Sequence, residues 1–114
     1  FLLIFVSFCE KIIEINLAPP SHLLSLNMYY FYVLKSTKNS ELYFGYTEDL
    51  KNRLMQHNSG KVPSTRLKKP LILVYYEAYH SQSDAKHREY SIKLRGNAYL
   101  QLKRRIMNCV AEAE

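Results

Sequence analysis

The chain has 114 residues, of which 47% are hydrophobic, and this length and composition predict a single domain with a modest core. Its formal net charge is +6, its isoelectric point is about 9.3, and it holds ten tyrosines but no tryptophan. A basic domain rich in aromatic side chains is typical of a protein that binds a polyanion, most often nucleic acid, although basic charge can also serve solubility alone.

The two cysteines exclude several classes of site. Cys9 and Cys109 stand far apart, and neither belongs to a CxxC motif or to a Cys/His cluster. The sequence therefore does not support a zinc finger, a zinc ribbon or a dithiol redox site. A disulfide framework is not expected either, which fits a cytoplasmic protein.

The first 27 residues differ in character from the rest. Their opening apolar run is far shorter than the ~20 residues of a membrane span, and it lacks the flanking features of a signal peptide. Met28 stands directly before the first good strand pattern. We therefore interpret 1–27 as a non-native or disordered extension, 28–108 as the folded domain and 109–114 as a tail, and we expect no membrane partner.

Two strands joined by a short polar turn follow. Tyr29–Lys35 and Leu42–Tyr46 are rich in aromatic and β-branched residues, which predicts strands. The segment Ser36–Ser40 between them has the composition of a turn, so the two strands should form an antiparallel hairpin.

The alternation of side chains along a strand assigns residues to faces of this hairpin. Tyr30, Tyr32 and Leu34 should share one face, and Tyr43 should share a face of its own strand with Gly45. Gly45 has no side chain, so it leaves room for a backbone or a ligand to come close. Most of the tyrosines are expected simply to pack in the core.

Thr47–Asn58 is predicted to be a helix, because its first residue is a favourable N-cap and a glycine closely follows its last. Leu50 and Leu54 mark its apolar stripe, and helical spacing adds Arg53 and His57 to that stripe. Burying an arginine without a partner is costly. Arg53 should therefore either meet a carboxylate or face an open cleft.

The segment 59–70 is predicted to be a loop. It carries four cations and no acid, namely Lys61, Arg66, Lys68 and Lys69. Such a loop can be an ordinary solvated surface. Beside a cleft, it would instead contact the phosphates of a nucleic acid.

The remaining segments predict one strand and two helices. Leu71–Tyr79 is apolar and rich in β-forming residues, which predicts a third strand. A second helix should begin at Ser81 or Ser83, which are good N-caps, and should end at Gly96. Asn97–Met107 is predicted to be a third helix with a basic cluster near its end.

Glu89 interrupts the apolar stripe of the second helix, since it lies four residues after Ala85 and three before Ile92. One explanation is an i,i+4 ion pair with Lys93 on the helix surface. Because Arg53 is also placed on an inward face, a polar site shared by the two helices is the better explanation.

These residue types suit the hydrolysis of a phosphodiester. An arginine can bind two phosphate oxygens, and one carboxylate with several waters can hold magnesium. A tyrosine or a histidine can orient or deprotonate the attacking water. Tyr43 would need adjacent cations to lower its pKa for this purpose, whereas His57 would need only to be neutral.

The motifs Tyr30-Phe31-Tyr32 and Tyr43-Phe44-Gly45, followed by the helix arginine and the downstream glutamate, resemble the GIY-YIG nuclease superfamily. The resemblance covers most of the chain, from Tyr29 to Ile106. It is closest to the small single-domain members and to the N-terminal nuclease domain of the nucleotide-excision-repair excinuclease. Aromatic residues replace the glycine and the isoleucines of the family motifs, which is a real departure from the usual pattern.

The resemblance implies both a fold and a site. The fold is α/β (α+β), with a three-stranded antiparallel sheet flanked by helices in the order β-β-α-β-α-α. Family members use one divalent ion, Mg²⁺ or Mn²⁺, bound by the glutamate that Glu89 matches. The positions that match the catalytic set of the family are Tyr32, Tyr43, Arg53, His57 and Glu89.

We therefore expect a metal-dependent endonuclease that hydrolyses DNA phosphodiester bonds. Its small size favours selectivity for branched, flapped or damaged DNA in repair or recombination, or recruitment by a protein partner, over the recognition of a base sequence. Two alternatives remain. The chain can be a basic module that binds nucleic acid without cutting it, or an interaction protein whose partner supplies the chemistry.

Overall fold

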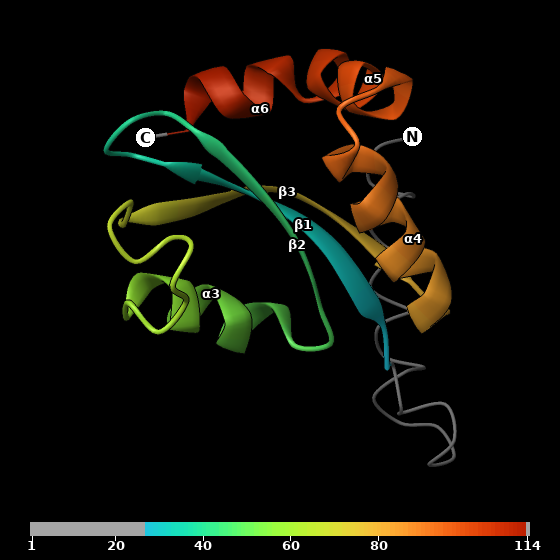
Figure 1. The fold of residues 1–114 in the computed structure, drawn as a ribbon, viewed down its shortest axis with the longest axis horizontal. Coiled ribbons are helices and arrows are strands. Elements are labelled where there is room, and N and C mark those ends of the chain that lie inside the picture. The colour runs from blue at the N-terminus through green and yellow to red at the C-terminus, as the bar shows by residue number, and fades with distance from the viewer. Residues whose placement is uncertain (1–26, 114) are drawn as a thin grey trace, which may run out of the picture.

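A computed structural model describes residues 27–113 of the chain (Figure 1). The interpretation of 1–27 as an extension therefore falls almost entirely outside the described residues. The elements in chain order are β1 (Tyr29–Ser36), β2 (Leu42–Thr47), α3 (Leu50–Asn58), β3 (Leu71–Tyr79), α4 (Gln82–Lys93), α5 (Asn97–Arg105) and α6 (Met107–Glu112). This is the predicted α+β fold, and its class and element order are confirmed. The third predicted helix is divided at Ile106 into α5 and α6, so most of the segment 109–114 is helical.

The sheet has three antiparallel strands in the order β2-β1-β3, so β1 is central and β2 is an edge strand. The register places Tyr32 opposite Gly45 and Leu34 opposite Tyr43. Because directly opposed residues share a face, these four residues lie on one side of the sheet. The alternation had predicted the pairing within each strand, Tyr32 with Leu34 and Tyr43 with Gly45, and the register brings the two pairs to the same face.

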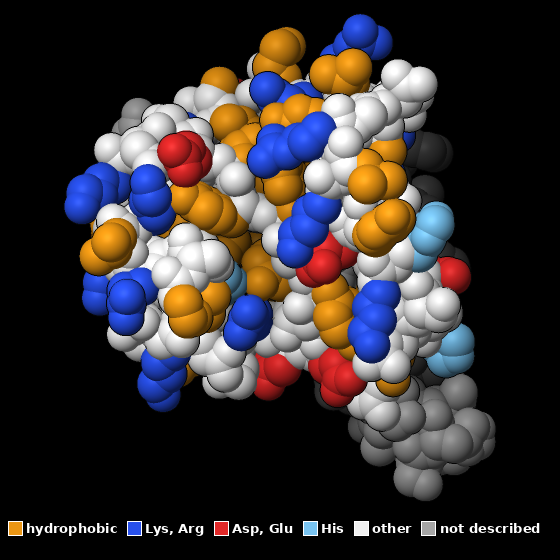
Figure 2. All heavy atoms as spheres, viewed as in Figure 1, with side chains coloured by type: hydrophobic (Ala, Val, Ile, Leu, Met, Phe, Trp, Pro, Cys, Tyr) orange, Lys and Arg blue, Asp and Glu red, His pale blue; other side chains and the backbone are white. Residues whose placement is uncertain are grey.

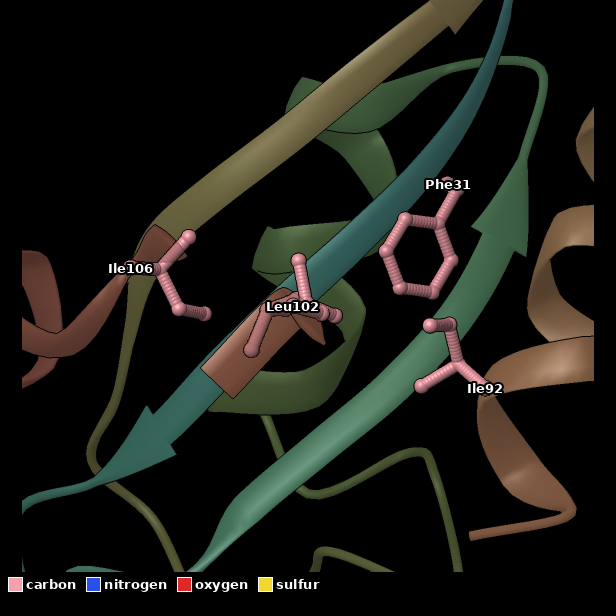
Figure 3. Packing of buried hydrophobic residues seen from close by; sticks show 5 residues of the cluster. Phe31, Ile92, Leu102 and Ile106 are labelled. Atoms are coloured by element: carbon pink, nitrogen blue, oxygen red, sulfur yellow. The ribbon is translucent and has the colours of Figure 1, made fainter. Parts of the chain in front are cut away.

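Helices cover both faces of the sheet, with α3 on one side and α4, α5 and α6 on the other (Figure 1). On the α3 side, Leu50 and Leu54 pack against the buried residues Tyr32, Leu34 and Leu71. On the other side, a fully buried cluster joins β1 to the last three helices (Figure 3). The cluster consists of Phe31, Val33, Ile92, Leu102 and Ile106. Ile92 thereby fixes α4 against the sheet three residues after Glu89.

Two helix ends differ from the prediction. The N-cap of α3 is Asp49, whose side chain accepts a hydrogen bond from the Asn52 backbone N–H at 3.1 Å. Thr47 is the last residue of β2 and pairs with Tyr30 of β1, so it belongs to the sheet and does not cap the helix. The end of α4 is formed by Arg95, whose φ is 60°, while Gly96 has an ordinary φ of −90°. The N-cap of α4 is Ser81, one of the two predicted serines.

Within residues 27–113, no helix combines the length and the apolar character that crossing a bilayer would require.

Candidate active site

A cavity of about 140 Å³ opens at the β2 edge of the sheet, where α3, α4 and the α3–β3 loop meet. It is lined by Tyr32, Tyr43, Phe44, Gly45, Tyr46, Arg53, His57, Val62, Ser64, Thr65, Glu89 and Lys93. All five residues predicted as catalytic are in this set. Arg53 and Glu89, which come from different helices on opposite faces of the sheet, thus meet at one hollow. A larger hollow of about 600 Å³, lined mainly by apolar and aromatic side chains of α3 and β3, includes none of the five.

Gly45 is the residue that admits Tyr32 to this cavity. A Cβ atom at position 45 would lie 2.3 Å from both Cζ and the hydroxyl oxygen of Tyr32, so no other residue fits while the ring stays in place. The sequence predicted that Gly45 leaves room for a backbone or a ligand, but the space is taken by the phenol ring of the neighbouring strand. The close approach carries the Tyr32 hydroxyl to the α3 side chains.

A chain of hydrogen bonds runs from Arg53 to the α3–β3 loop. Arg53 Nε–H donates to the Tyr32 hydroxyl at 3.3 Å, and that hydroxyl lies 2.9 Å from Nε2 of His57. His57 Nδ1 lies 2.7 Å from the hydroxyl of Thr65, which is almost fully buried. When the Tyr32 hydroxyl donates to Nε2, His57 carries its hydrogen on Nδ1 and donates it to the Thr65 hydroxyl, and we assign this tautomer to the network.

The charge states of this network follow from its burial. His57 is 4% exposed, and desolvation, helped by the nearby charge of Arg53, lowers its pKa to about 4. The imidazole is therefore neutral at neutral pH. Burial also raises the pKa of Tyr32, and this outweighs the opposing hydrogen bond and charge of Arg53. The resting site thus holds a protonated phenol that donates to a neutral imidazole.

Tyr43 has a different environment from Tyr32. Its hydroxyl donates to the carboxylate of Glu41 at 2.7 Å, on the side of the β1–β2 turn. Burial and this contact raise its pKa. To act as a base, Tyr43 would need nearby cations that lower its pKa. Its surroundings raise that pKa instead, so they disfavour a base role.

Arg53 is half-buried and has no carboxylate partner among the described residues. Its side chain donates to Tyr32 and, through Nη1, to the side-chain oxygen of Gln56 at 3.1 Å. The sequence predicted that Arg53 would either pair with a carboxylate or face an open cleft. The structure shows the second, since Arg53 lines the cavity. The free donors of the guanidinium are available to an anion in the cavity.

Glu89 shows both features that the sequence suggested for it. Its carboxylate forms an i,i+4 ion pair with Lys93 at 3.3 Å, and both residues line the cavity. The side chain of Glu89 is 26% exposed, so it remains accessible from the hollow.

The family of the chain is decided by the length of the match. The family model of the GIY-YIG catalytic domain matches residues 28–104. The chain belongs to the GIY-YIG family. This is the catalytic domain of a nuclease superfamily, and the matched range contains every residue that the sequence analysis placed in the site.

Several relatives of this GIY-YIG chain carry the name UPF0213 protein, which states no activity. One from Bacillus pumilus is 48% identical over 66 residues, covering 57% of this chain and 66% of the relative. One from Pediococcus pentosaceus is 42% identical over 71 residues, covering 61% and 74%. One from Staphylococcus haemolyticus is 44% identical over 66 residues, covering 57% and 79%. No solved structure matches the chain significantly.

The predicted metal site can be tested against the oxygen ligands of this GIY-YIG domain. Residues 27–113 contain no group of three or more His, Cys, Asp or Glu side chains that would hold an ion by themselves. Glu89 is one carboxylate beside a hollow with space for water and phosphate oxygens. Mg²⁺ is commonly held by one or two carboxylates, waters and substrate phosphates, so the donor set fits a hard divalent ion.

The predicted nucleic-acid-binding loop forms one wall of the cavity through its residues Val62, Ser64 and Thr65. Its four cations, Lys61, Arg66, Lys68 and Lys69, do not line the hollow. Lys68 lies 3.9 Å from Glu41, and the other three are exposed. The loop is therefore beside the site, while its four cations lie outside the lining of the cavity.

Sequence reasoning did not assign Thr65 to the site and considered Lys93 only as a partner of Glu89. Thr65 carries no signal of its own, because an isolated threonine in a loop has no characteristic spacing. Lys93 follows Glu89 by one helical turn, so its position at the cavity could have been inferred once Glu89 was placed there.

Proposed function

We propose that this GIY-YIG domain is a metal-dependent endonuclease that hydrolyses DNA phosphodiester bonds. The observation that supports it best is the convergence of Arg53 and Glu89 on one cavity, with the Tyr32–His57 pair between the sheet and α3. Arg53 has no internal carboxylate partner among the described residues, so an anion in the hollow would complete its hydrogen bonding.

Arg53 would bind the non-bridging oxygens of the scissile phosphate. Its Nε is already occupied by Tyr32 and one Nη by Gln56, which fixes the plane of the guanidinium before substrate arrives. A donor group that is held in position stabilises the negative charge of the transition state without reorganising.

The Tyr32–His57 pair would orient and deprotonate the attacking water. Of the two motif tyrosines, Tyr32 is the one that is hydrogen-bonded to Arg53, and neutral His57 can take up its phenolic proton through Nε2. Thr65 would hold the imidazole in the tautomer that leaves Nε2 free to accept. Tyr43 then serves as a wall of the site and not as the base.

Glu89 would hold the divalent ion, Mg²⁺ or Mn²⁺. When bound, such an ion neutralises charge on the phosphate and lowers the pKa of a coordinated water. The ion pair of Glu89 with Lys93 would then be exchanged for the metal, and Lys93 would become free to face the phosphate.

Selectivity for DNA shape or damage, as in repair or recombination, extends this proposal. The cavity is small and lies at an exposed sheet edge, where a kinked or unpaired strand can approach more easily than the interior of a regular duplex. A protein partner that recruits the domain to such sites is compatible with the same arrangement.

The test is a cleavage screen with the full chain on nicked, flapped, branched and single-stranded DNA, with and without Mg²⁺ or Mn²⁺. We expect metal-dependent cleavage of at least one substrate. Glu89→Gln should lower the rate at least about 100-fold, as expected when several kcal/mol of charge stabilisation is lost.

The matched control is Asp84→Asn, which removes an exposed carboxylate from the first turn of the same helix. It should leave the cleavage rate within about twofold, since it lines no part of the cavity. If DNA binds without metal and is never cut, and if Glu89→Gln behaves as the wild type does, the domain is a non-catalytic binding module.

A further inference from the structure

A second group of cations lies on the α4–α5 side of the cavity, and each member is seated on an aromatic ring. Lys86 Nζ is 5.5 Å from the centre of the Tyr46 ring. The guanidinium of Arg95 is 5.5 Å from the centre of Phe44 and 4.5 Å from that of Tyr99. Lys103 Nζ also lies 5.5 Å from the centre of the Tyr99 ring. We call Lys86, Arg95 and Lys103 together the α4–α5 cation row.

The row borders the candidate active site. Phe44 and Tyr46, on which Arg95 and Lys86 rest, both line the cavity. Figure 2 shows Lys and Arg side chains over the α3–β3 loop on one side of this face and over α4 and α5 on the other. Cations thus lie on two sides of the cavity. The sequence showed the basic cluster that contains Lys103, but contacts with nucleic acid were proposed from it only for the loop.

The charge of the row is not neutralised within the described part of the chain. Three ion pairs form between residues 27 and 113, and they use Lys68, Arg88 and Lys93. All three members of the row are exposed and have no carboxylate within ion-pair distance there. The rings restrict the motion of the cations, so less side-chain entropy is lost when they bind an anion.

The backbone of Arg95 gives an independent indication. It has a φ of 60°, the left-handed conformation that ends many helices and is usually filled by glycine, because a Cβ atom makes it unfavourable. Gly96 is the next residue, yet it has a φ of −90° and a Cβ there would meet nothing within 4 Å. An arginine thus occupies the strained position although helix termination favours glycine. Strain of this kind is often found at functional sites.

We propose that the α4–α5 cation row binds backbone phosphates of DNA, so that the strand crosses the cavity between the row and the α3–β3 loop. The inference rests on the proposed function for the identity of the polyanion. It adds the second edge of the binding surface and assigns Arg95 as its central contact. Phosphate contacts of this kind set the position of a strand without reading its bases.

Binding of a short labelled DNA duplex, without divalent metal and in a Glu89→Gln background, tests the row separately from catalysis. Arg95→Gly should weaken binding roughly three- to tenfold, as expected for the loss of one charged contact. Its melting temperature should change little, because glycine suits the left-handed conformation and this offsets the loss of the contacts with Phe44 and Tyr99. Arg95→Lys should keep most of the affinity. A structural role for Arg95 predicts the reverse, namely a lower melting temperature and unchanged binding.

The double variant Lys86→Gln/Lys103→Gln should reduce the slope of log K against log salt by roughly 2. The control pair Lys51→Gln/Arg104→Gln removes two exposed cations that rest on no ring and should reduce it less. Equal effects of the two pairs, or unchanged binding by Arg95→Gly, would overturn the inference. Absence of cleavage by the wild type would instead count against the proposed function and leave these binding results unaffected.

Discussion

At the scale of single residues, the site depends on the contact between Tyr32 and Gly45. The ring of Tyr32 is 3% exposed, and its hydroxyl reaches Arg53 and His57 only because the opposite residue lacks a side chain. The same tyrosine therefore belongs to the core and to the site. Its ring packs on the α3 side of the sheet, while its hydroxyl forms part of the cavity wall.

Gly45→Ala should damage both stability and activity. The new methyl group would overlap the Tyr32 ring, which is held by backbone on one side and by α3 on the other, so the ring must leave His57. We expect a loss of about 1–3 kcal/mol in the free energy of unfolding, as for overpacking elsewhere, together with loss of DNA cleavage. Urea unfolding and the cleavage assay measure the two effects.

Gly96→Ala is the matched control for that substitution. Gly96 has a φ of −90°, and a Cβ atom there would meet nothing within 4 Å. Because Gly96 is also the N-cap of α5, where alanine is less favourable, its free energy of unfolding should fall by about 1 kcal/mol at most, and its rate of DNA cleavage should not change. Equal effects at the two glycines would show that the close approach of Tyr32 is not what makes Gly45 important.

At the scale of elements, α4 carries Glu89 to the cavity. This helix packs on the sheet through apolar residues and is also fixed to β3 by polar contacts. Arg88 donates two hydrogen bonds, from Nε and Nη2, to the two carboxylate oxygens of Glu77 on β3, at 3.0 and 3.1 Å. Tyr75 and Tyr79 donate to the same carboxylate. Burial opposes ionisation of Glu77, but these donors outweigh it and lower its pKa. Because Arg88 precedes Glu89, this pair fixes the rotation of α4 at the site.

Glu77→Gln should loosen α4 without touching the cavity. The substitution leaves Arg88 half-buried without its carboxylate, which should cost about 1–3 kcal/mol of the free energy of unfolding. The rate of cleavage at saturating metal should fall less than the apparent affinity for the divalent ion, since the position of Glu89 changes and its chemistry does not. Metal titrations of the cleavage rate separate the two, and a change in neither would exclude this role for the Glu77–Arg88 pair.

At the scale of the whole molecule, the patterns that sequence reasoning used were those with a fixed period. Strand alternation placed Tyr32 with Leu34 and Tyr43 with Gly45, and helical spacing placed Arg53, His57 and Glu89 on inward faces, all in agreement with the fold. Features that depend on contacts between distant segments leave no periodic pattern in the sequence, so they could not be predicted from it.

The contacts that sequence reasoning missed illustrate why. Thr65 joins the site because the α3–β3 loop folds back on His57, and the ring of Tyr32 fills the space at Gly45 because of the strand register. Near helix ends, the sequence offers two acceptable residues for the same role. Thr47 and Asp49 can both cap a helix, but Thr47 is part of β2 and Asp49 is the N-cap of α3. Arg95, and not Gly96, took the left-handed conformation, against the usual preference for glycine.

The acid stability of the whole molecule should reveal the buried histidine. The pKa of His57 is about 4 in the folded chain and 6.5 in an unfolded one, so the unfolded state binds more protons between these values. Stability should therefore fall as the pH drops below 6.5, with about 2–3 kcal/mol lost to His57 by about pH 4. Glu77, whose pKa is lowered by folding, adds a further loss as the pH falls through its folded pKa.

The variant His57→Gln tests this assignment. Its amide can still bond to Tyr32 and Thr65 but cannot be protonated, so the free energy of unfolding should depend less on pH between about pH 6.5 and 4. Urea unfolding at a series of pH values measures it. Parallel curves for the variant and the wild type would mean that His57 is not held neutral by burial.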